Sequence, residues 1–204
     1  MSVVAVWAIA IGTLAACTGA PDDSAATAGS AAFTGDLPEF TGPYAAEFAQ
    51  TYRDTDSAFA REVLADSVIT DAEHAEMVEQ FSNCLEGKGL TFKGYNPDGG
   101  YTTSSAPDPD KTQGMIDECS ATSGEDAVGS MYDIMRINPE NLDWATIGAQ
   151  CLVTAGVVPA DYDAEDYTRD NEGRFVEFGA LPTDLQEALR SCSVDPLGIL
   201  DQQQ

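Results

Sequence analysis

The chain has 204 residues, of which 35 are Asp or Glu and 9 are Lys or Arg, so its formal net charge is −26. This length suffices for one ordinary domain with a hydrophobic core. So acidic a surface repels the phosphates of nucleic acids and anionic lipid headgroups, and we expect no nucleic-acid partner. Solubility in a salty or wall-exposed setting explains the charge most simply, and binding of a cation or of a cationic partner is the alternative.

An apolar run opens the chain and stops at a cysteine. Residues 2–16 are apolar or small, too short to cross a bilayer comfortably, and end in Leu-Ala-Ala before Cys17. A short apolar segment followed by small residues predicts an export signal. The Leu-Ala-Ala-Cys sequence resembles the lipobox of bacterial lipoproteins, which implies cleavage before Cys17 and acylation of that cysteine. A cleaved secretory signal with an incidental cysteine is the alternative.

Composition divides the chain into four parts. We assign residues 1–16 to a lipoprotein signal peptide, 17–42 to a flexible tether, 43–195 to a globular domain and 196–204 to a polar tail. The tether is rich in Ala, Gly, Ser, Thr, Asp and Pro, and cannot bury enough apolar surface to offset the entropy of ordering. Lipid on Cys17 would hold the domain at the outer face of the cytoplasmic membrane, in the cell envelope, without a membrane-spanning helix.

Two helices that meet at a corner are predicted first. Pro43 begins an apolar stripe at helical spacing, which ends near residues 65–67. Thr70, with Glu73 three residues later, forms a capping box that begins the next helix. The apolar positions of this second helix share one face, which places Cys84 in a core.

A hairpin and a second helical unit follow. Residues 91–95 and 101–104 contain beta-formers on both sides of a Pro-Asp-Gly turn, which predicts a hairpin before a short helix over 111–119. Asn138 and Pro139 have the pattern of a cap and a first helical residue. Further along, we expect helices over 126–136, 139–155 and 185–192, and an acidic, aromatic insertion over 157–181 with a strand at 174–178.

Two stretches of the chain match each other around four cysteines. The shared pattern is a Cys-Leu pair followed by a glycine: Cys84, Leu85 and Gly89 in the first stretch, and Cys151, Leu152 and Gly156 in the second. Such self-similarity predicts two repeated units, about 43–124 and 125–195. We therefore expect an α+β fold that is mostly helical, built from two helix–hairpin–helix units with one disulfide each.

The repeat also predicts which cysteines pair. Four cysteines allow three pairings, and a duplicated unit most simply carries its own bridge. We expect Cys84 to pair with Cys119 and Cys151 with Cys192, which export from the cytoplasm makes chemically plausible. The bridges close loops of about 35 to 41 residues, and each stabilises the fold by on the order of 4 kcal/mol. A four-cysteine metal site is the alternative, although the cysteines lack C-x-x-C spacing.

The residues argue against an enzyme. His74 is the only histidine, and no nearby serine or free cysteine would form a nucleophile–base pair with it. We expect a structural or incidental role for His74. The chain contains no glycine-rich phosphate loop, H-E-x-x-H motif or dinucleotide fingerprint.

One acidic stretch resembles a calcium loop. Asp161, Asp163, Glu165 and Glu172 occupy the first, third, fifth and twelfth positions of an EF-hand-like loop, but Asp166 stands where such loops have glycine. A calcium site at these four residues is one hypothesis, and a solvated acidic loop is the other. A weaker calcium pattern spans residues 66–73. No other cofactor is expected.

Aromatic side chains on the predicted hairpin and on the acidic insertion offer a partner surface. Tyr95 and Tyr101 lie in the hairpin over 91–104, and Tyr162 and Tyr167 lie in the insertion over 157–181. Aromatic and acidic residues on projecting hairpins suit a protein interface. Packing against their own helices is the alternative, because aromatic residues are mostly buried.

The corner and the cysteines together resemble small actinobacterial envelope lipoproteins of undefined activity. The matching residues are Ala65, Asp66, Ile69, Thr70, Cys84, Leu85 and Cys119. The resemblance implies an exported, disulfide-bonded accessory protein and supplies no catalytic residue. We expect a non-catalytic, membrane-anchored module that binds an envelope protein; the alternative is an extracytoplasmic sensor that binds calcium or a small ligand.

Overall fold

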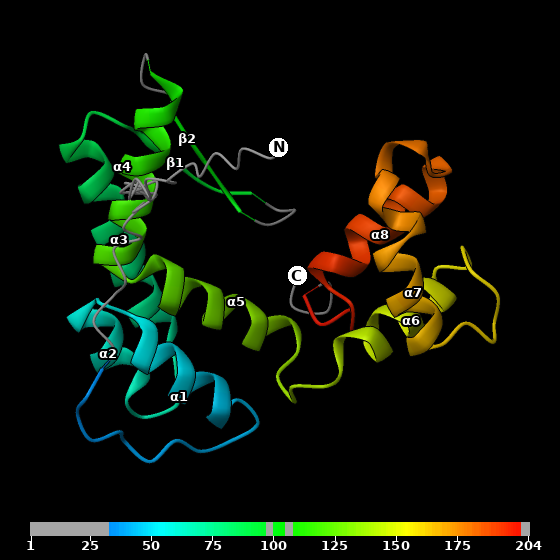
Figure 1. The fold of residues 1–204 in the computed structure, drawn as a ribbon, viewed down its shortest axis with the longest axis horizontal. Helices are drawn as coiled ribbons and strands as arrows, with labels where there is room; N and C mark the ends of the chain where they lie inside the picture. Colours follow the sequence, from blue (N-terminus) through cyan, green and yellow to red (C-terminus); the bar gives the residue numbers. More distant parts are fainter. Residues whose placement is uncertain (1–32, 97–99, 105–107, 201–204) are drawn as a thin grey trace, which may run out of the picture.

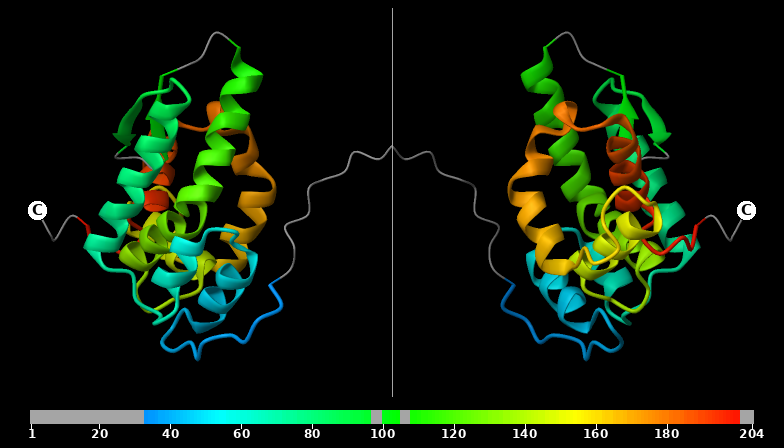
Figure 2. Two further views of the ribbon diagram at one scale, coloured as in Figure 1. Left: turned by 90° about the vertical axis from the view of Figure 1, so that its left-hand side faces the viewer. Right: turned by 90° about the vertical axis from the view of Figure 1, so that its right-hand side faces the viewer.

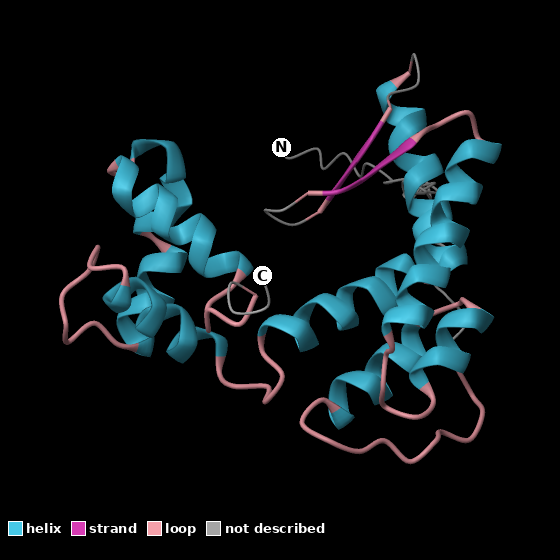
Figure 3. Ribbon diagram, turned by 180° about the vertical axis from the view of Figure 1, so that it is seen from behind, coloured by secondary structure: helices cyan, strands magenta, loops and turns pink. Residues whose placement is uncertain are grey.

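The computed structural model describes residues 33–96, 100–104 and 108–200. This part of the chain is mostly helical, with one antiparallel two-stranded sheet (Figure 3). None of its helices is long and apolar enough to cross a bilayer. The predicted signal peptide and Cys17 lie outside the described residues.

The helices form two lobes joined by residues 138–143 (Figure 1). We call residues 33–137 the N-lobe and residues 144–200 the C-lobe. The most extensive contacts between elements each fall within one lobe. The N-lobe contains α1 (Ala45–Asp54), α2 (Ala58–Leu64), α3 (Asp71–Gly87), β1 (Phe92–Tyr95), β2 (Tyr101–Thr103), α4 (Pro109–Ser123), the π-helix η1 (Glu125–Gly129) and α5 (Ser130–Ile137). The C-lobe contains α6 (Trp144–Thr154), α7 (Ala164–Glu172), the 3-10 helix η2 (Arg174–Ala180) and α8 (Thr183–Val194).

The predicted corner between two helices is confirmed. After α2 ends, Ser67 adopts a φ of 64°, and Ile69 is buried at the bend. Thr70 begins α3 through the predicted capping box: its hydroxyl accepts a hydrogen bond from the Glu73 N–H at 3.2 Å, while the Glu73 carboxylate accepts one from the Thr70 N–H at 2.8 Å. The reciprocal bonds fix where α3 starts and therefore where its buried face points.

The end of the predicted tether packs on the N-lobe. Phe33 lies edge-on to Tyr52, with ring centroids 5.3 Å apart, and Phe40 stacks on Phe48 at 6.3 Å. In Figures 1 and 2 this segment, drawn in blue, runs along the end of the N-lobe beside α1. Residues 33–42 thus join the folded domain, because two aromatic side chains supply apolar surface that the earlier part of the tether lacks.

The predicted hairpin is confirmed. β1 and β2 pair antiparallel, with Phe92 opposite Thr103 and Tyr95 opposite Tyr101. Phe92 and Tyr101 both pack edge-on against Phe81 of α3, at 5.6 Å and 5.1 Å between ring centroids. The sheet therefore rests on the same core cluster that contains Cys119.

Both predicted disulfides are present. Cys84 bonds to Cys119 and joins α3 to α4, with Cα atoms 5.6 Å apart. Cys151 bonds to Cys192 and joins α6 to α8, with Cα atoms 5.8 Å apart. Each lobe therefore contains one disulfide between two helices.

The predicted helix start at Pro139 is wrong, because α6 begins at Trp144. Asn138 is fully buried, and its side-chain amide donates to the Leu142 carbonyl at 2.8 Å and accepts from the Leu142 N–H at 2.9 Å. This pair of bonds closes a turn that a helix could not accommodate. Asp143 then caps α6 by accepting from the Thr146 N–H at 2.8 Å.

The strand predicted at 174–178 is also wrong, since η2 occupies that stretch. The insertion contains α7 and η2 instead of a second hairpin, and no strand lies in the described residues of the C-lobe. Asp163 begins α7 by accepting hydrogen bonds from the Glu165 and Asp166 N–H groups, at 2.9 Å and 3.0 Å. The beta-forming residues at 174–178 have no partner strand in the described part of the chain, and they form η2 instead.

Part of the predicted polar tail is an ordered turn. The Asp195 carboxylate accepts hydrogen bonds from the Ile199 and Leu200 N–H groups, both at 2.8 Å, and Pro196 is buried. Residues 201–204 lie outside the described part of the chain. The turn brings the apolar residues after α8 back toward the N-lobe (Figure 1).

Candidate ligand-binding cleft

A cleft of about 390 Å³ lies between the two lobes. Its volume falls within the range of about 300–1,000 Å³ that is typical of small-molecule sites. In Figure 1 the strands β1 and β2 and the helix α5 lie on the side of the N-lobe that faces α8 and the C-terminal turn. The described lining residues are His74, Tyr95, Asn96, Gly100, Asp133, Arg136 and Ile137 from the N-lobe, and Ser193, Val194 and Leu200 from the C-lobe.

Helix α5 supplies both charges of the cleft. Asp133, Arg136 and Ile137 lie three and four residues apart, so they share one face of the helix. The guanidinium carbon of Arg136 lies 5.4 Å from the ring centroid of Tyr132. Among the described residues, no carboxylate forms an ion pair with Arg136 within 4.0 Å. Arg136 therefore presents a charged fork that no described side chain neutralises directly.

The pKa of Asp133 is raised, mainly because neighbouring atoms take its carboxyl group partly out of water. The nearby His74 and Arg136 act in the opposite direction and favour the ionised form. A carboxylate in such a position gains from a cationic ligand group, because that group replaces lost hydration.

His74 stacks on Tyr132, with ring centroids 3.9 Å apart and an angle of 12° between the planes. The Tyr132 hydroxyl donates to the Asp71 carboxylate at 2.7 Å, so the stacked pair is fixed to the start of α3. Burial lowers the pKa of His74, against the smaller opposing effect of Asp133. At neutral pH the imidazole is therefore an uncharged hydrogen-bonding group in the wall of the cleft.

Tyr95 forms the hairpin side of the cleft. Its hydroxyl donates to the Glu125 carboxylate at 3.5 Å, and the other oxygen of Glu125 accepts from the Ser120 hydroxyl. Burial raises the pKa of Glu125, and burial together with the nearby Glu125 charge raises the pKa of the Tyr95 hydroxyl. The π-helix η1 begins at Glu125, which follows Gly124 with a φ of 78°, so an irregular backbone supports this contact.

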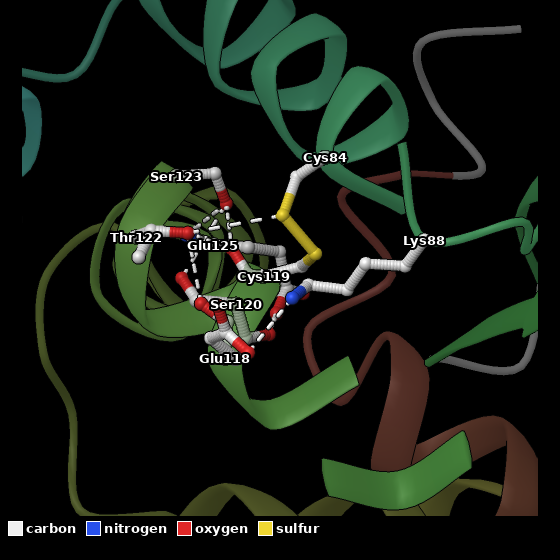
Figure 4. Close-up of a disulfide and its surroundings, with 8 residues drawn as sticks. All are labelled: Cys84, Lys88, Glu118, Cys119, Ser120, Thr122, Ser123 and Glu125. Carbon is white, nitrogen blue, oxygen red and sulfur yellow. Dashed lines mark hydrogen bonds and ion pairs between the residues drawn. A yellow bond between two sulfur atoms is a disulfide. The ribbon is translucent and has the colours of Figure 1, made fainter. Parts of the chain in front are cut away.

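The disulfide of the N-lobe lies beside the same support. Figure 4 shows Ser120 and Glu125 next to the Cys84–Cys119 bridge, with Lys88 reaching across to Glu118 at 2.7 Å. The bridge and the ion pair both join α3 to α4. These links fix the helix pair on which the hairpin and its tyrosine rest.

Comparison of the chain with protein-family models, with curated proteins and with solved structures finds no match. The functional interpretation therefore rests on the residues and their geometry.

The four tyrosines of the predicted partner surface fall into two separate pairs. Tyr95 and Tyr101 are opposite each other in the hairpin, with ring centroids 6.0 Å apart; Tyr95 lines the cleft and Tyr101 packs against Phe81. Tyr162 and Tyr167 pack against the core cluster of the C-lobe. The Tyr162 hydroxyl also donates to the Asp170 carboxylate at 3.1 Å.

The residues of the predicted calcium loop lie around a helix. Asp163 is the N-cap of α7, and Glu165 and Glu172 fall in its first and last turns. The described residues contain no group of three or more His, Cys, Asp or Glu side chains that could hold a metal ion. Because the backbone is helical, the carboxylates of Asp161, Asp163, Glu165 and Glu172 do not converge as in an EF-hand loop.

The cleft was not predicted from the sequence, although two features of the sequence point to its walls. The apolar residues of the turn after α8, Leu197, Ile199 and Leu200, contradict a purely polar tail. The pair Asp133 and Arg136 has the spacing of one helix face. What the sequence could not show was that these two segments lie opposite each other.

Proposed function

We propose that this protein is a non-catalytic binding protein of the cell envelope that holds a small organic ligand in the cleft between its lobes. The observation that carries the proposal is the cleft itself, which gathers charged, hydrogen-bonding and apolar side chains from both lobes. Pockets with a few convergent polar groups on an apolar lining are the usual form of small-ligand sites.

The lining chemistry favours binding over catalysis. The imidazole of His74 is stacked on Tyr132, and Glu125 is engaged by Tyr95 and Ser120. The four cysteines of the described domain are paired in disulfides, so none of them is a free nucleophile. The proposal requires no cofactor and no calcium.

The proposed location is the outer face of the cytoplasmic membrane. It is supported by the lipobox-like sequence before Cys17 and by two disulfides, which persist in oxidising compartments. Acyl chains on Cys17 would anchor the domain. Fractionation of cells and intact mass measurement test this: the wild-type chain should be membrane-bound and acylated, while Cys17→Ser should be neither. A wild-type chain without acyl mass would contradict the anchor.

A thermal-shift screen of the full chain against small organic metabolites tests the binding function. Compounds that bind the cleft should raise the melting temperature of the wild type and not that of Ser193→Trp, whose indole would fill the cleft from α8. The matched control is Ser191→Trp, an exposed position of the same helix outside the lining. No stabilising compound, or equal stabilisation of the wild type and Ser193→Trp, would contradict the proposal.

Binding of an envelope protein is the second candidate. Leu142, on the segment that joins the lobes, and Trp144, the first residue of α6, are two positions apart in the sequence and are 44% and 42% exposed. Large exposed apolar side chains of this kind suit a protein contact. Photo-crosslinking in cells from position 144, with position 95 in the cleft as comparison, tests it. One envelope protein captured from 144 but not from 95 would favour this candidate.

We also propose that the two disulfide-linked helix pairs are copies of one ancestral unit, as the matching Cys-Leu and glycine positions suggest. Gly89 and Gly156 both adopt positive φ, of 78° and 72°, after the first cysteine-bearing helix of each unit. In both units the residue after the glycine donates its N–H to the leucine of the Cys-Leu pair: Leu90 to Leu85 at 2.9 Å, and Val157 to Leu152 at 3.3 Å. The same helix ending in both units supports duplication.

A further inference from the structure

Resting on the proposed function, we infer the class of ligand: a zwitterion of no net charge with a branched aliphatic part, such as a free α-amino acid of the leucine type. Two opposite charges lie in the cleft. Asp133 and Arg136 lie one turn apart on the same face of α5, and the described ion pairs do not include one between them.

Arg136 fits a carboxylate. Its planar guanidinium offers parallel N–H donors, the geometry that carboxylates bind in a bidentate manner. Among the described lining residues it is the only cation at neutral pH, because burial lowers the pKa of His74. Asn96 and Ser193 add hydrogen-bonding groups to the lining.

Asp133 fits an ammonium group. Its carboxylate lies three residues before Arg136, so an amino group and a carboxylate of one small molecule can face the two side chains together. The chain has a net charge of −26, which would repel a simple anion from the cleft. A ligand with one charge of each sign uses both side chains and avoids that repulsion.

The apolar part of the ligand has its own wall. Ile137 continues the face of α5, and Val194 and Leu200 approach from the C-lobe. These three side chains are aliphatic, and such lining gains affinity with each methylene that it covers. The ligand's side chain would therefore touch both lobes, while its charged groups touch only the N-lobe.

Isothermal titration of the full chain with a matched set of probes tests the inference. The probes are L-leucine, L-leucinamide, which lacks the carboxylate, and 4-methylpentanoate, which lacks the amine. We expect L-leucine to bind at least about tenfold more tightly than either analogue, because each analogue leaves one charged side chain unpaired.

Two variants assign the charges. Arg136→Gln should reduce the affinity for L-leucine to that for L-leucinamide, and Asp133→Asn should reduce it to that for 4-methylpentanoate. Arg136 is exposed, so the melting temperature of unliganded Arg136→Gln should stay close to that of the wild type. Unliganded Asp133→Asn should melt at the same temperature or higher, because the substitution removes a partly desolvated carboxylate.

Several results would overturn the inference. Equal affinity for L-leucine and for either analogue would show that the protein does not recognise the charged group which that analogue lacks. A further outcome is that the thermal-shift screen yields compounds that stabilise the wild type but not Ser193→Trp, while neither L-leucine nor its analogues bind the wild type. In that case the ligand class is wrong and the binding function stands. If the screen also yields no compound, the binding function fails with it.

Discussion

Gly148 lies in α6 directly beneath the ring of Tyr167 from α7. A Cβ built on Gly148 would come within 2.7 Å of the tyrosine ring. The ring is part of the C-lobe core, so it has little freedom to move away. The absence of a side chain at one residue thus permits two helices to approach.

Gly148→Ala should lower the free energy of unfolding by about 1–3 kcal/mol, because the added methyl overpacks the contact with Tyr167. Urea denaturation followed by circular dichroism measures it. The matched control is Gly114→Ala in α4, where a Cβ meets no atom within 4 Å. That substitution should stabilise the chain by up to about 1 kcal/mol through helix propensity. An unchanged midpoint for Gly148→Ala would contradict the packing described.

The stack of His74 on Tyr132 makes stability depend on pH. Burial holds the pKa of His74 below its ordinary value, so the unfolded chain binds a proton at this residue more readily than the folded chain. Its contribution is complete above the ordinary pKa of about 6.5 and is lost as the pH falls through the window down to the folded-state pKa.

His74→Phe should keep the stack and remove this slope. Denaturation of the wild type and the variant between about pH 5 and pH 8 measures the difference, and His74 is the only histidine in the chain. The raised pKa values of Glu125 and Asp133 give a slope of opposite sign, because stability falls as the pH rises from the ordinary pKa of these carboxyl groups through their folded-state pKa. Parallel curves for both proteins above pH 5 would refute the burial of His74.

The role of a single residue can be predicted from the sequence when its partners are close to it along the chain. The capping role of Thr70 was predictable because Glu73 is three residues away. The surroundings of His74 were not, because Tyr132 reaches it from a distant helix. The disulfides are the exception, since the matching Cys-Leu pairs carried long-range information.

At the scale of elements, the start of α3 is the best-defined boundary. Thr70→Ala should lower the free energy of unfolding by about 1 kcal/mol, because the N–H of Glu73 loses its acceptor. Denaturation in urea measures it. Thr168→Ala is the control, since this exposed threonine lies inside α7 and donates only to the Ala164 carbonyl. Its effect should stay within about 0.5 kcal/mol. Equal effects of both substitutions would contradict the cap.

Helices and strands were predictable where the residue pattern favours the same structure as the packing around it. The first hairpin and most of the helices with an apolar face are confirmed. The single helix expected from Pro43 to about 65 is divided into α1 and α2, and the boundaries near 138–143 and the strand at 174–178 are wrong. The side chain of Asn138 closes a turn in one case, and in the other the described residues offer no partner strand to 174–178. Neither competition could be decided from residue preferences alone.

At the scale of the molecule, the cleft arises from the placement of two lobes joined by a fixed segment. The Tyr44 hydroxyl donates to the Asn138 carbonyl at 2.7 Å, and the Asn141 amide donates to the Pro43 carbonyl at 2.9 Å. These bonds hold residues 138–141 against the N-lobe. No periodicity in the sequence encodes the position of α8 relative to α5, so the cleft was not predictable.

Hydrogen–deuterium exchange of the full chain, with and without a stabilising compound from the screen, tests the central claim most directly. A ligand in the cleft should slow exchange in the segments around 95–100 and 133–137 of the N-lobe and around 193–200 of the C-lobe, all at once. Protection confined to one lobe, or protection equal in Ser193→Trp, would contradict a binding site between the lobes.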